Sequence, residues 1–169
     1  MKVLIVRHGP AGDGAAWEAE GRDDRLRPLT PDGKKQMRRA AAGLPFLVED
    51  LSLVATSSLT RAVQTAEIVA AEYGCKIVPL EALAPDHDPE ATMGWLREQQ
   101  SDLTVGLVGH EPHLSTLVGY LLIGKRASFL NLKKGGACLL EMTTPLQPCG
   151  GALAWLVTPR ELRRLGELE

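Results

Sequence analysis

Three short apolar stretches of this chain each stop at a basic or hydroxyl residue and are each followed by a helix-forming segment. The stretches span residues 3–6, 51–56 and 104–109, and they consist mainly of the aliphatic and β-branched residues typical of buried strands. A helix start follows the first of them at Thr30-Pro31-Asp32, where threonine suits the cap and proline the first turn. Strands that alternate with helices predict an α/β fold, a three-layer sandwich with a mainly parallel central sheet and helices on both faces.

The chain between and after these stretches gives further expectations. Residues 10–27, rich in glycine and charge, predict an irregular loop in which Arg22, Asp23, Asp24 and Arg25 form a solvated surface. We expect a helix from residue 31 to about 47. The other expected elements are a strand at 76–79, a helix at 89–99, a hairpin that pairs 130–132 with 137–142, a strand at 152–157 and a helix at 159–168.

Bulk properties narrow the classes of protein. A length of 169 residues favours one domain spanning 1–169, and a net charge of −2 gives no electrostatic case for binding nucleic acid or an anionic membrane. Three cysteines without paired metal spacing indicate reduced thiols. No apolar run approaches the length of a membrane span, and the first residues are too short for a signal peptide. These features predict a soluble protein of the cytoplasm.

The arginines and histidines that could bind or react with a ligand lie at or just after the ends of the three stretches. Arg7 and His8 follow the first stretch, Arg61 follows the turn after the second, and His110 follows the third. Ligands of open α/β sheets bind at the carboxyl ends of the strands, so these four side chains are expected in one crevice. Gly9 lets the backbone turn sharply beside His8 and lets a ligand approach the main chain.

A crevice with two arginines and two histidines favours a polyanion. A histidine at a strand end is a general base, a metal ligand or a nucleophile, and the adjacent Arg7 argues for an anion because guanidinium matches phosphate oxygens. An imidazole nitrogen can attack phosphorus directly and form a phosphohistidine, while the arginines hold the oxygens. The chain has no glycine-rich phosphate loop, and Asp86-His87-Asp88 is better explained as a solvated turn than as a metal site. We therefore expect no metal and no cofactor.

Three motifs together resemble the histidine phosphatase (phosphoglycerate mutase-like) superfamily. They are Arg7-His8-Gly9, the run from Ser57 to Ala66 that contains Thr60-Arg61-Ala62, and Val108-Gly109-His110-Glu111-Pro112. Within the superfamily, the Arg27-Pro28-Leu29-Thr30 motif, the Lys133-Lys134-Gly135-Gly136 stretch and the short length resemble the SixA-type phosphohistidine phosphatases.

The resemblance implies a fold and a role for each motif residue. The fold is that of phosphoglycerate mutase without its large helical insertion. His8 is implied as the phosphorylated nucleophile, and Arg7, Arg61 and His110 complete the phosphate pocket. Further substrate-binding residues are expected at Arg27, Gly9 and Ser57.

One departure from the family concerns the proton donor. Larger members carry an acidic donor on an inserted helical region, for which this chain is too short; Glu81, Asp86 and Glu111 are candidates, and none clearly matches. An alkoxide leaving group needs a proton, whereas imidazole, with a pKa of about 6.5 in histidine, carries its own before the P–N bond breaks. The absence of a matching acid therefore favours phosphohistidine over a sugar phosphate.

Three functions remain open from the sequence. The first is a phosphohistidine phosphatase that acts in signal transduction on a histidine phosphotransfer domain through a phosphohistidine enzyme intermediate. The second is a phosphatase of a small phosphorylated metabolite, which a deep pocket or a carboxylate beside His110 would favour. The third is a non-catalytic module that binds phosphate.

Overall fold

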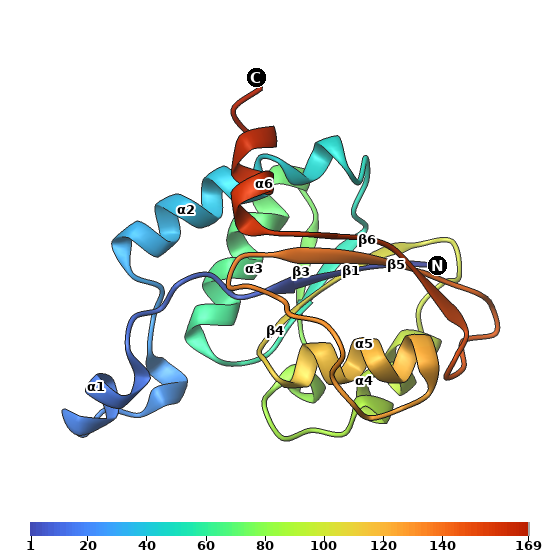
Figure 1. Ribbon diagram of the computed structural model, residues 1–169, viewed down its shortest axis with the longest axis horizontal. Coiled ribbons are helices and arrows are strands. Elements are labelled where there is room, and N and C mark those ends of the chain that lie inside the picture. Colours follow the sequence, from blue (N-terminus) through green and yellow to red (C-terminus); the bar gives the residue numbers. More distant parts are fainter. Residues whose placement is uncertain (169) are drawn as a thin grey trace.

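A six-stranded sheet forms the centre of the computed structural model, which describes residues 1–168 (Figure 1). The strands are β1 (Lys2–Arg7), β2 (Leu53–Thr56), β3 (Lys76–Pro79), β4 (Thr104–Gly109), β5 (Ala137–Met142) and β6 (Gly151–Val157). Their order across the sheet is β3-β2-β4-β1-β5-β6. The pairs β3–β2, β2–β4 and β4–β1 are parallel, whereas β5 is antiparallel to both of its neighbours. The sheet is mainly parallel, as predicted.

Helices cover both faces of this sheet. The α-helices are α1 (Gly14–Ala19), α2 (Pro31–Ala41), α3 (Thr60–Tyr73), α4 (Pro89–Arg97), α5 (His113–Ile123) and α6 (Pro159–Leu165), and 3₁₀ turns lie at η1 (Asp24–Leu26), η2 (Leu44–Phe46) and η3 (Glu81–Leu83). Figure 1 shows α2, α3 and α6 on one face and α4 and α5 on the other. None of the helices within residues 1–168 has the length and apolar character needed to cross a bilayer.

Strand β1 supplies side chains to both hydrophobic cores. Val3 and Ile5 pack into the core formed with α4 and α5, and Leu4 and Val6 pack into the core formed with α2, α3 and α6. Successive strand residues point to opposite faces, so a strand between two helical layers must be apolar at every position. The unbroken run of residues 3–6 therefore places β1 at the centre and its carboxyl end inside the molecule.

The register of the parallel strands brings three chain segments to one edge of the sheet. Arg7 lies opposite Gly109, and Thr56 lies opposite Val108. The hydrogen bonds continue past the strands, because the His8 N–H donates to the Gly109 carbonyl at 3.1 Å. The residues that follow β1, β2 and β4 consequently emerge side by side.

Helix α2 begins where the sequence predicts and ends earlier. The Thr30 side chain accepts a hydrogen bond from the Gly33 N–H at 2.9 Å, and Pro31 occupies the first turn. The predicted end near residue 47 is wrong, since the α-helix stops at Ala41 and the chain continues as the 3₁₀ turn η2. Pro45 within that turn has no N–H to donate and cannot continue an α-helix.

The region 10–27, expected to be irregular, contains α1 and η1. The Asp13 side chain caps α1 by accepting from the Ala15 N–H at 2.9 Å, and the Arg22 guanidinium lies 4.6 Å from the centre of the Trp17 ring. No residue of α1 is buried. The helix therefore has no apolar stripe from which periodicity could predict it.

The predicted hairpin between residues 130–132 and β5 is also wrong. The partners of β5 are β1 and β6. Leu132 is buried, and its carbonyl accepts a hydrogen bond from the Arg7 guanidinium at 2.9 Å. This segment therefore packs at the end of β1 and does not pair with β5. The tight turn itself is present, because the Gly136 N–H donates to the Lys133 carbonyl at 2.8 Å.

Candidate active site

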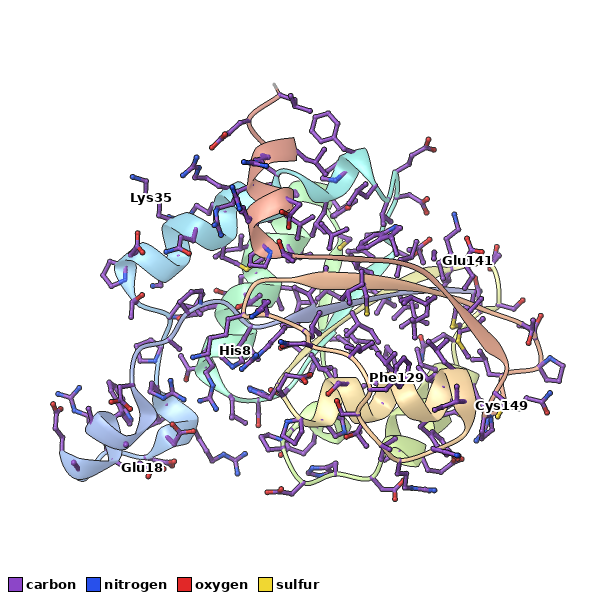
Figure 2. All side chains as sticks on the ribbon, in the orientation of Figure 1. His8, Glu18, Lys35, Phe129, Glu141 and Cys149 are labelled. Carbon is purple, nitrogen blue, oxygen red and sulfur yellow. The ribbon has the colours of Figure 1, made fainter. Side chains whose placement is uncertain are left out.

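His8 lies directly after β1, at the carboxyl edge of the sheet, and only 5% of its surface is exposed (Figure 2). Its Nδ1 is 2.7 Å from the Gly9 carbonyl oxygen. A carbonyl only accepts hydrogen bonds, so Nδ1 of the neutral ring carries the proton. The lone pair of His8 is therefore on Nε2, the nitrogen positioned to act as a nucleophile.

A second histidine faces the first. The rings of His8 and His110 lie 5.1 Å apart, centre to centre, at an angle of 49°. His110 follows β4, is 3% exposed, and has its Nε2 2.6 Å from the Ser57 hydroxyl oxygen. Its Nδ1 is buried without a hydrogen-bond partner in the part of the chain that the structure describes. Ser57, at the end of β2, thus fixes the ring orientation of His110.

Arg61 reaches the same place from the first turn of α3. Its guanidinium donates to the Asp24 carbonyl at 2.9 Å and to the Asp24 carboxylate at 3.1 Å, and only 6% of the residue is exposed. The Thr65 hydroxyl donates to the Arg61 carbonyl and accepts from the Gly9 N–H, which ties α3 to the loop after β1. Burial lowers the pKa of Arg61, and the charge of Asp24 opposes that shift.

Asp24, expected on a solvated surface, keeps 31% of its side chain exposed and is paired within the protein. Its carboxylate accepts from Arg27 Nε at 2.7 Å and from Arg61 Nη2 at 3.1 Å, so one acid joins two arginines. Burial would raise the pKa of Asp24, but the hydrogen bond from Arg27 and the charge of Arg61 lower it below its usual value. The carboxylate is therefore ionised at neutral pH and holds both guanidinium groups in place.

The predicted substrate-binding residues differ in what they still offer to a ligand. Arg27 donates to Asp24 and to the carbonyls of Ala11 and Gly12, so its guanidinium joins loops beside the site. The Gly9 N–H is bound to Thr65 and its carbonyl to His8, and both main-chain groups are occupied within the protein. The Ser57 hydroxyl contacts His110.

Two further cations border His8. Arg7 donates through Nη1 to the Leu132 carbonyl, and its Nε is buried without a partner among residues 1–168. The turn carrying Lys134 lies on the end of β1, because the Gly135 N–H bonds the carbonyls of both Arg7 and His8 at 3.1 Å. Burial and then the charges of Arg7, Arg27 and Arg61 lower the pKa of Lys134. The sequence motifs identified Lys134 only as part of a resemblance, without a role at the site.

The three candidate acids occupy three different environments. Glu81 is exposed, accepts from the Ser58 hydroxyl at 2.8 Å and lies 3.5 Å from Arg25. Glu111 accepts from the N–H and the hydroxyl of Ser115 in the first turn of α5. Asp86 lines a separate cleft with His113. Only Glu81 is joined to the Ser57-Ser58 turn that holds His110.

Both site histidines are neutral in the free protein. Burial, and then the charges of Arg61, Arg7 and Lys134, lower the pKa of His8 to about 3. Burial, and then the charges of His8 and Arg61, lower the pKa of His110 to about 3. A neutral His8 retains its nucleophilic lone pair well below pH 7. The site thus combines two neutral imidazoles with the fixed charges of Arg7 and Arg61.

These lowered pKa values predict an acid-labile fold. In the unfolded chain histidine titrates near 6.5, so between pH 6.5 and 3 the unfolded state binds more protons and the free energy of unfolding falls as pH falls. Between pH 6.5 and 5 we expect a loss of about 2 kcal/mol for each of His8 and His110. Urea unfolding in phosphate-free buffer measures it, with His8→Gln as the comparison. A loss of the same size in His8→Gln would contradict the assignment.

The arrangement suits binding of a tetrahedral oxyanion and attack on it by an imidazole. Guanidinium groups at Arg7 and Arg61 match phosphoryl oxygens, and their charges act on His8, whose ring lies 5.1 Å from that of His110. Among residues 1–168, no group of three or more histidine, cysteine, aspartate or glutamate side chains is placed to hold a metal ion. Asp86-His87-Asp88 lies in a loop in which Asp88 pairs with Arg126 at 2.9 Å.

Comparison with known proteins gives consistent results. The family model described as "Histidine phosphatase superfamily (branch 1)" matches residues 3–85. An uncharacterised protein of Picosynechococcus sp. is 37% identical over 139 residues, which cover 80% of this chain and 82% of that protein. The structure of the protein histidine phosphatase SixA complexed with tungstate has a TM-score of 0.81 at 25% identity, covering 96% of this chain and 99% of SixA.

A phosphoserine phosphatase of Entamoeba histolytica shares the fold, with a TM-score of 0.69 at 15% identity over 95% of this chain and 98% of that protein. The match to SixA over nearly the whole of both chains confirms the compact phosphoglycerate mutase-like architecture. The chain belongs to the histidine phosphatase superfamily and is of the SixA type.

Proposed function

We propose that this protein is a phosphohistidine phosphatase that removes the phosphoryl group from a phosphorylated partner protein. The choice of substrate rests on where the three candidate proton donors lie. Glu111 is engaged by Ser115, Asp86 lies in another cleft, and Glu81 is exposed between Ser58 and Arg25. A leaving group that brings its own proton fits a site with this arrangement, and the imidazole of phosphohistidine does so.

The reaction proceeds in two displacements. His8 Nε2 attacks phosphorus while the P–N bond to the substrate imidazole breaks, and the bonding electron pair goes to that nitrogen. The substrate imidazole keeps the proton on its other ring nitrogen and therefore departs as a neutral histidine. Arg7 and Arg61 hold the phosphoryl oxygens as charge builds on them, and His110, whose ring lies 5.1 Å from that of His8, adds a further contact to the group. Water then attacks phosphorus while the P–N bond to His8 breaks, and the electron pair returns to Nε2. Nδ1 keeps its proton, the two protons of the water leave on the phosphate, and the ring is neutral again.

The likeness to SixA, which is a protein histidine phosphatase, supports a protein substrate. A second candidate is a phosphatase of a small phosphorylated metabolite, because a phosphoserine phosphatase shares the fold and Glu81 stands beside the Ser57-Ser58 turn as a possible acid. The two candidates use the same nucleophile and pocket. They differ in the leaving group, and the leaving group decides the experiment.

The experiment compares phosphate release from a phosphohistidine-bearing transfer domain with release from a panel of sugar phosphates and phosphoserine. We expect kcat/KM for the protein substrate to exceed that for every ester by at least about tenfold, because the alkoxide needs a donor that imidazole does not. His8→Ala supplies the background rate. A preference for an ester, lost in Glu81→Gln, would establish the second candidate. Tight phosphate binding without turnover of any substrate would indicate a binding module.

A further inference from the structure

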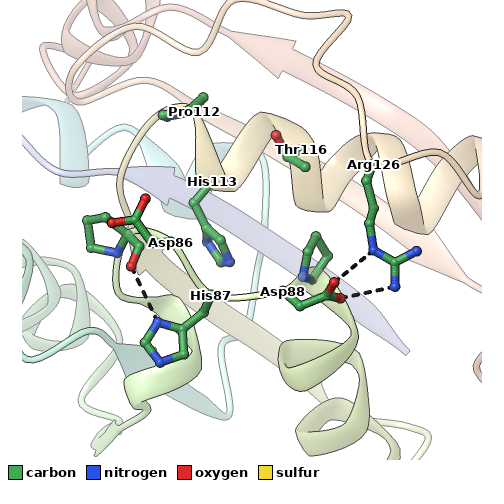
Figure 3. Close-up of a pocket in the computed structure, with 9 residues that line it drawn as sticks. Asp86, His87, Asp88, Pro112, His113, Thr116 and Arg126 are labelled. Carbon is green, nitrogen blue, oxygen red and sulfur yellow. Dashed lines mark hydrogen bonds and ion pairs between the residues drawn. The ribbon is translucent and has the colours of Figure 1, made fainter.

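A second cleft opens beside the phosphate pocket, and we call it the His113 cleft (Figure 3). It is lined by the loop 85–89, the first turn of α5 and Arg126. Helix α5 begins at His113, shortly after His110, and the Leu114 N–H donates to the His110 carbonyl at 2.8 Å. The cleft and the phosphate pocket therefore share one wall, the segment 110–113, and a ligand in one lies next to a ligand in the other.

His113 is a buried histidine that lines this cleft. His113 is 6% exposed, and neither of its ring nitrogens makes a hydrogen bond of normal geometry to any described residue. Figure 3 shows the ring between the loop and α5. Buried polar groups are nearly always hydrogen-bonded, since an unmade bond costs roughly 1–3 kcal/mol. His113 therefore has the hydrogen-bonding capacity that a ligand would use.

Of the two acids beside the His113 ring, one is paired with an arginine and the other is not, within residues 1–168. Asp88 is neutralised by Arg126, which donates to its two carboxylate oxygens at 2.9 and 3.1 Å. Asp86 has φ 72°, a conformation that Asn and Asp adopt more readily than other side chains, and it forms no ion pair within residues 1–168. Burial lowers the pKa of His113, so the ring is neutral and offers an acceptor. The Thr116 hydroxyl adds a second acceptor at the cleft wall.

This set of groups matches a cation that donates several hydrogen bonds. A carboxylate, a neutral imidazole and a hydroxyl accept together from an ammonium or a guanidinium, whereas an anion would be repelled by Asp86. A phosphoryl group in the pocket of Arg7 and Arg61 and a basic group in the His113 cleft would be two separate anchors for one partner. The opposite charges of the two sites also fix the direction in which that partner binds.

We propose that the His113 cleft binds a lysine or arginine side chain that the partner protein carries close to its phosphohistidine. The proposal rests on the proposed function, because it places the two groups on one phosphorylated protein. The occupant donates to His113 and pairs with Asp86, while Arg126 holds the Asp88 loop in shape. The cleft thereby selects among phosphohistidine proteins by the residue next to the phosphorylated position.

Phosphohistidine peptides with lysine or norleucine at each position within three residues of the phosphohistidine test the proposal. We expect kcat/KM to be roughly three- to fivefold higher for at least one lysine peptide, through a lower KM, the size expected of one partly exposed ion pair. In Asp86→Asn, which keeps the shape and tolerates the same φ, the lysine preference should disappear. Asp102→Asn, an exposed acid outside the cleft, is the matched control and should keep the preference.

The possible results test the assignment of the His113 cleft separately from the proposed phosphohistidine phosphatase activity. Equal rates for lysine and norleucine peptides at every position would overturn the assignment of the cleft and leave phosphohistidine hydrolysis intact. An unchanged lysine preference in Asp86→Asn would also overturn it. Failure to hydrolyse any phosphohistidine substrate would remove the proposed function and the inference together. A dependence on Asp86 seen only with small aminoalkyl phosphates would assign the cleft to a metabolite instead of a protein.

Discussion

Replacement of His8 with alanine is expected to lower kcat by at least about four orders of magnitude and to abolish the phosphoenzyme. The reason lies in the ring geometry, since Nδ1 is held by the Gly9 carbonyl and Nε2 is the nitrogen left to form the bond to phosphorus. Ser57 and His110 are held to each other by the 2.6 Å contact between the Ser57 hydroxyl and His110 Nε2. The loss should therefore appear in the chemical step and not only in substrate binding.

The measurement is mass spectrometry of the quenched enzyme during turnover, together with the rate of phosphate release. His110→Gln is the informative comparison, because it removes an imidazole from the same pocket and leaves His8 in place. We expect this variant to be slow and still to carry the phosphoryl group on His8. Phosphorylation of His8→Ala, or a retained rate above about 1% of the wild type, would show that another residue is the nucleophile.

The fold was predictable because its pattern is local. A parallel strand buried on both faces must be apolar throughout, so residues 3–6 and 104–109 are recognisable in the sequence, and a helix start such as Thr30-Pro31 is set by neighbours in the chain. The same reasoning placed His8 and His110 at strand ends. Since parallel strands end at one edge, sequence alone could bring them to the same crevice.

The features that the sequence did not predict depend on contacts between residues far apart in the chain, or on the lack of a buried face. Asp24 lies among charged residues typical of an exposed loop, and its partner Arg61 is 37 positions away. Helix α1 has no buried face and so no periodicity. Leu132 ends a run that resembles a short strand, yet its carbonyl is the acceptor for Arg7. In each case the determining interaction is tertiary, and no local pattern records it.

Replacement of Arg61 with methionine is expected to lower kcat/KM by roughly three orders of magnitude. In the proposed mechanism Arg61 contacts the phosphoryl oxygens, and the variant loses that charge. It also leaves the Asp24 carboxylate without the guanidinium that now lies 3.1 Å from it. With Arg27 as its one remaining guanidinium partner, the ionised carboxylate repels the incoming phosphoryl group more strongly than in the wild type, where two arginines balance it. The loss in kcat/KM should consequently exceed the loss caused by removing the Arg61 contact to the phosphoryl group by itself.

A double-mutant cycle with Asp24→Asn separates these two contributions. In the wild-type background Asp24→Asn should lower kcat/KM by about tenfold, because Arg27 and Arg61 lose the acid that joins them. In the Arg61→Met background the same change should raise kcat/KM by roughly fivefold, because it removes the repulsion. Asp23→Asn should change neither value more than twofold, because the exposed Asp23 side chain accepts from the Arg25 N–H, a bond that the asparagine oxygen can also accept. The reversal of sign is the decisive result, since an acid that merely stabilised the loop would lower the rate in both backgrounds.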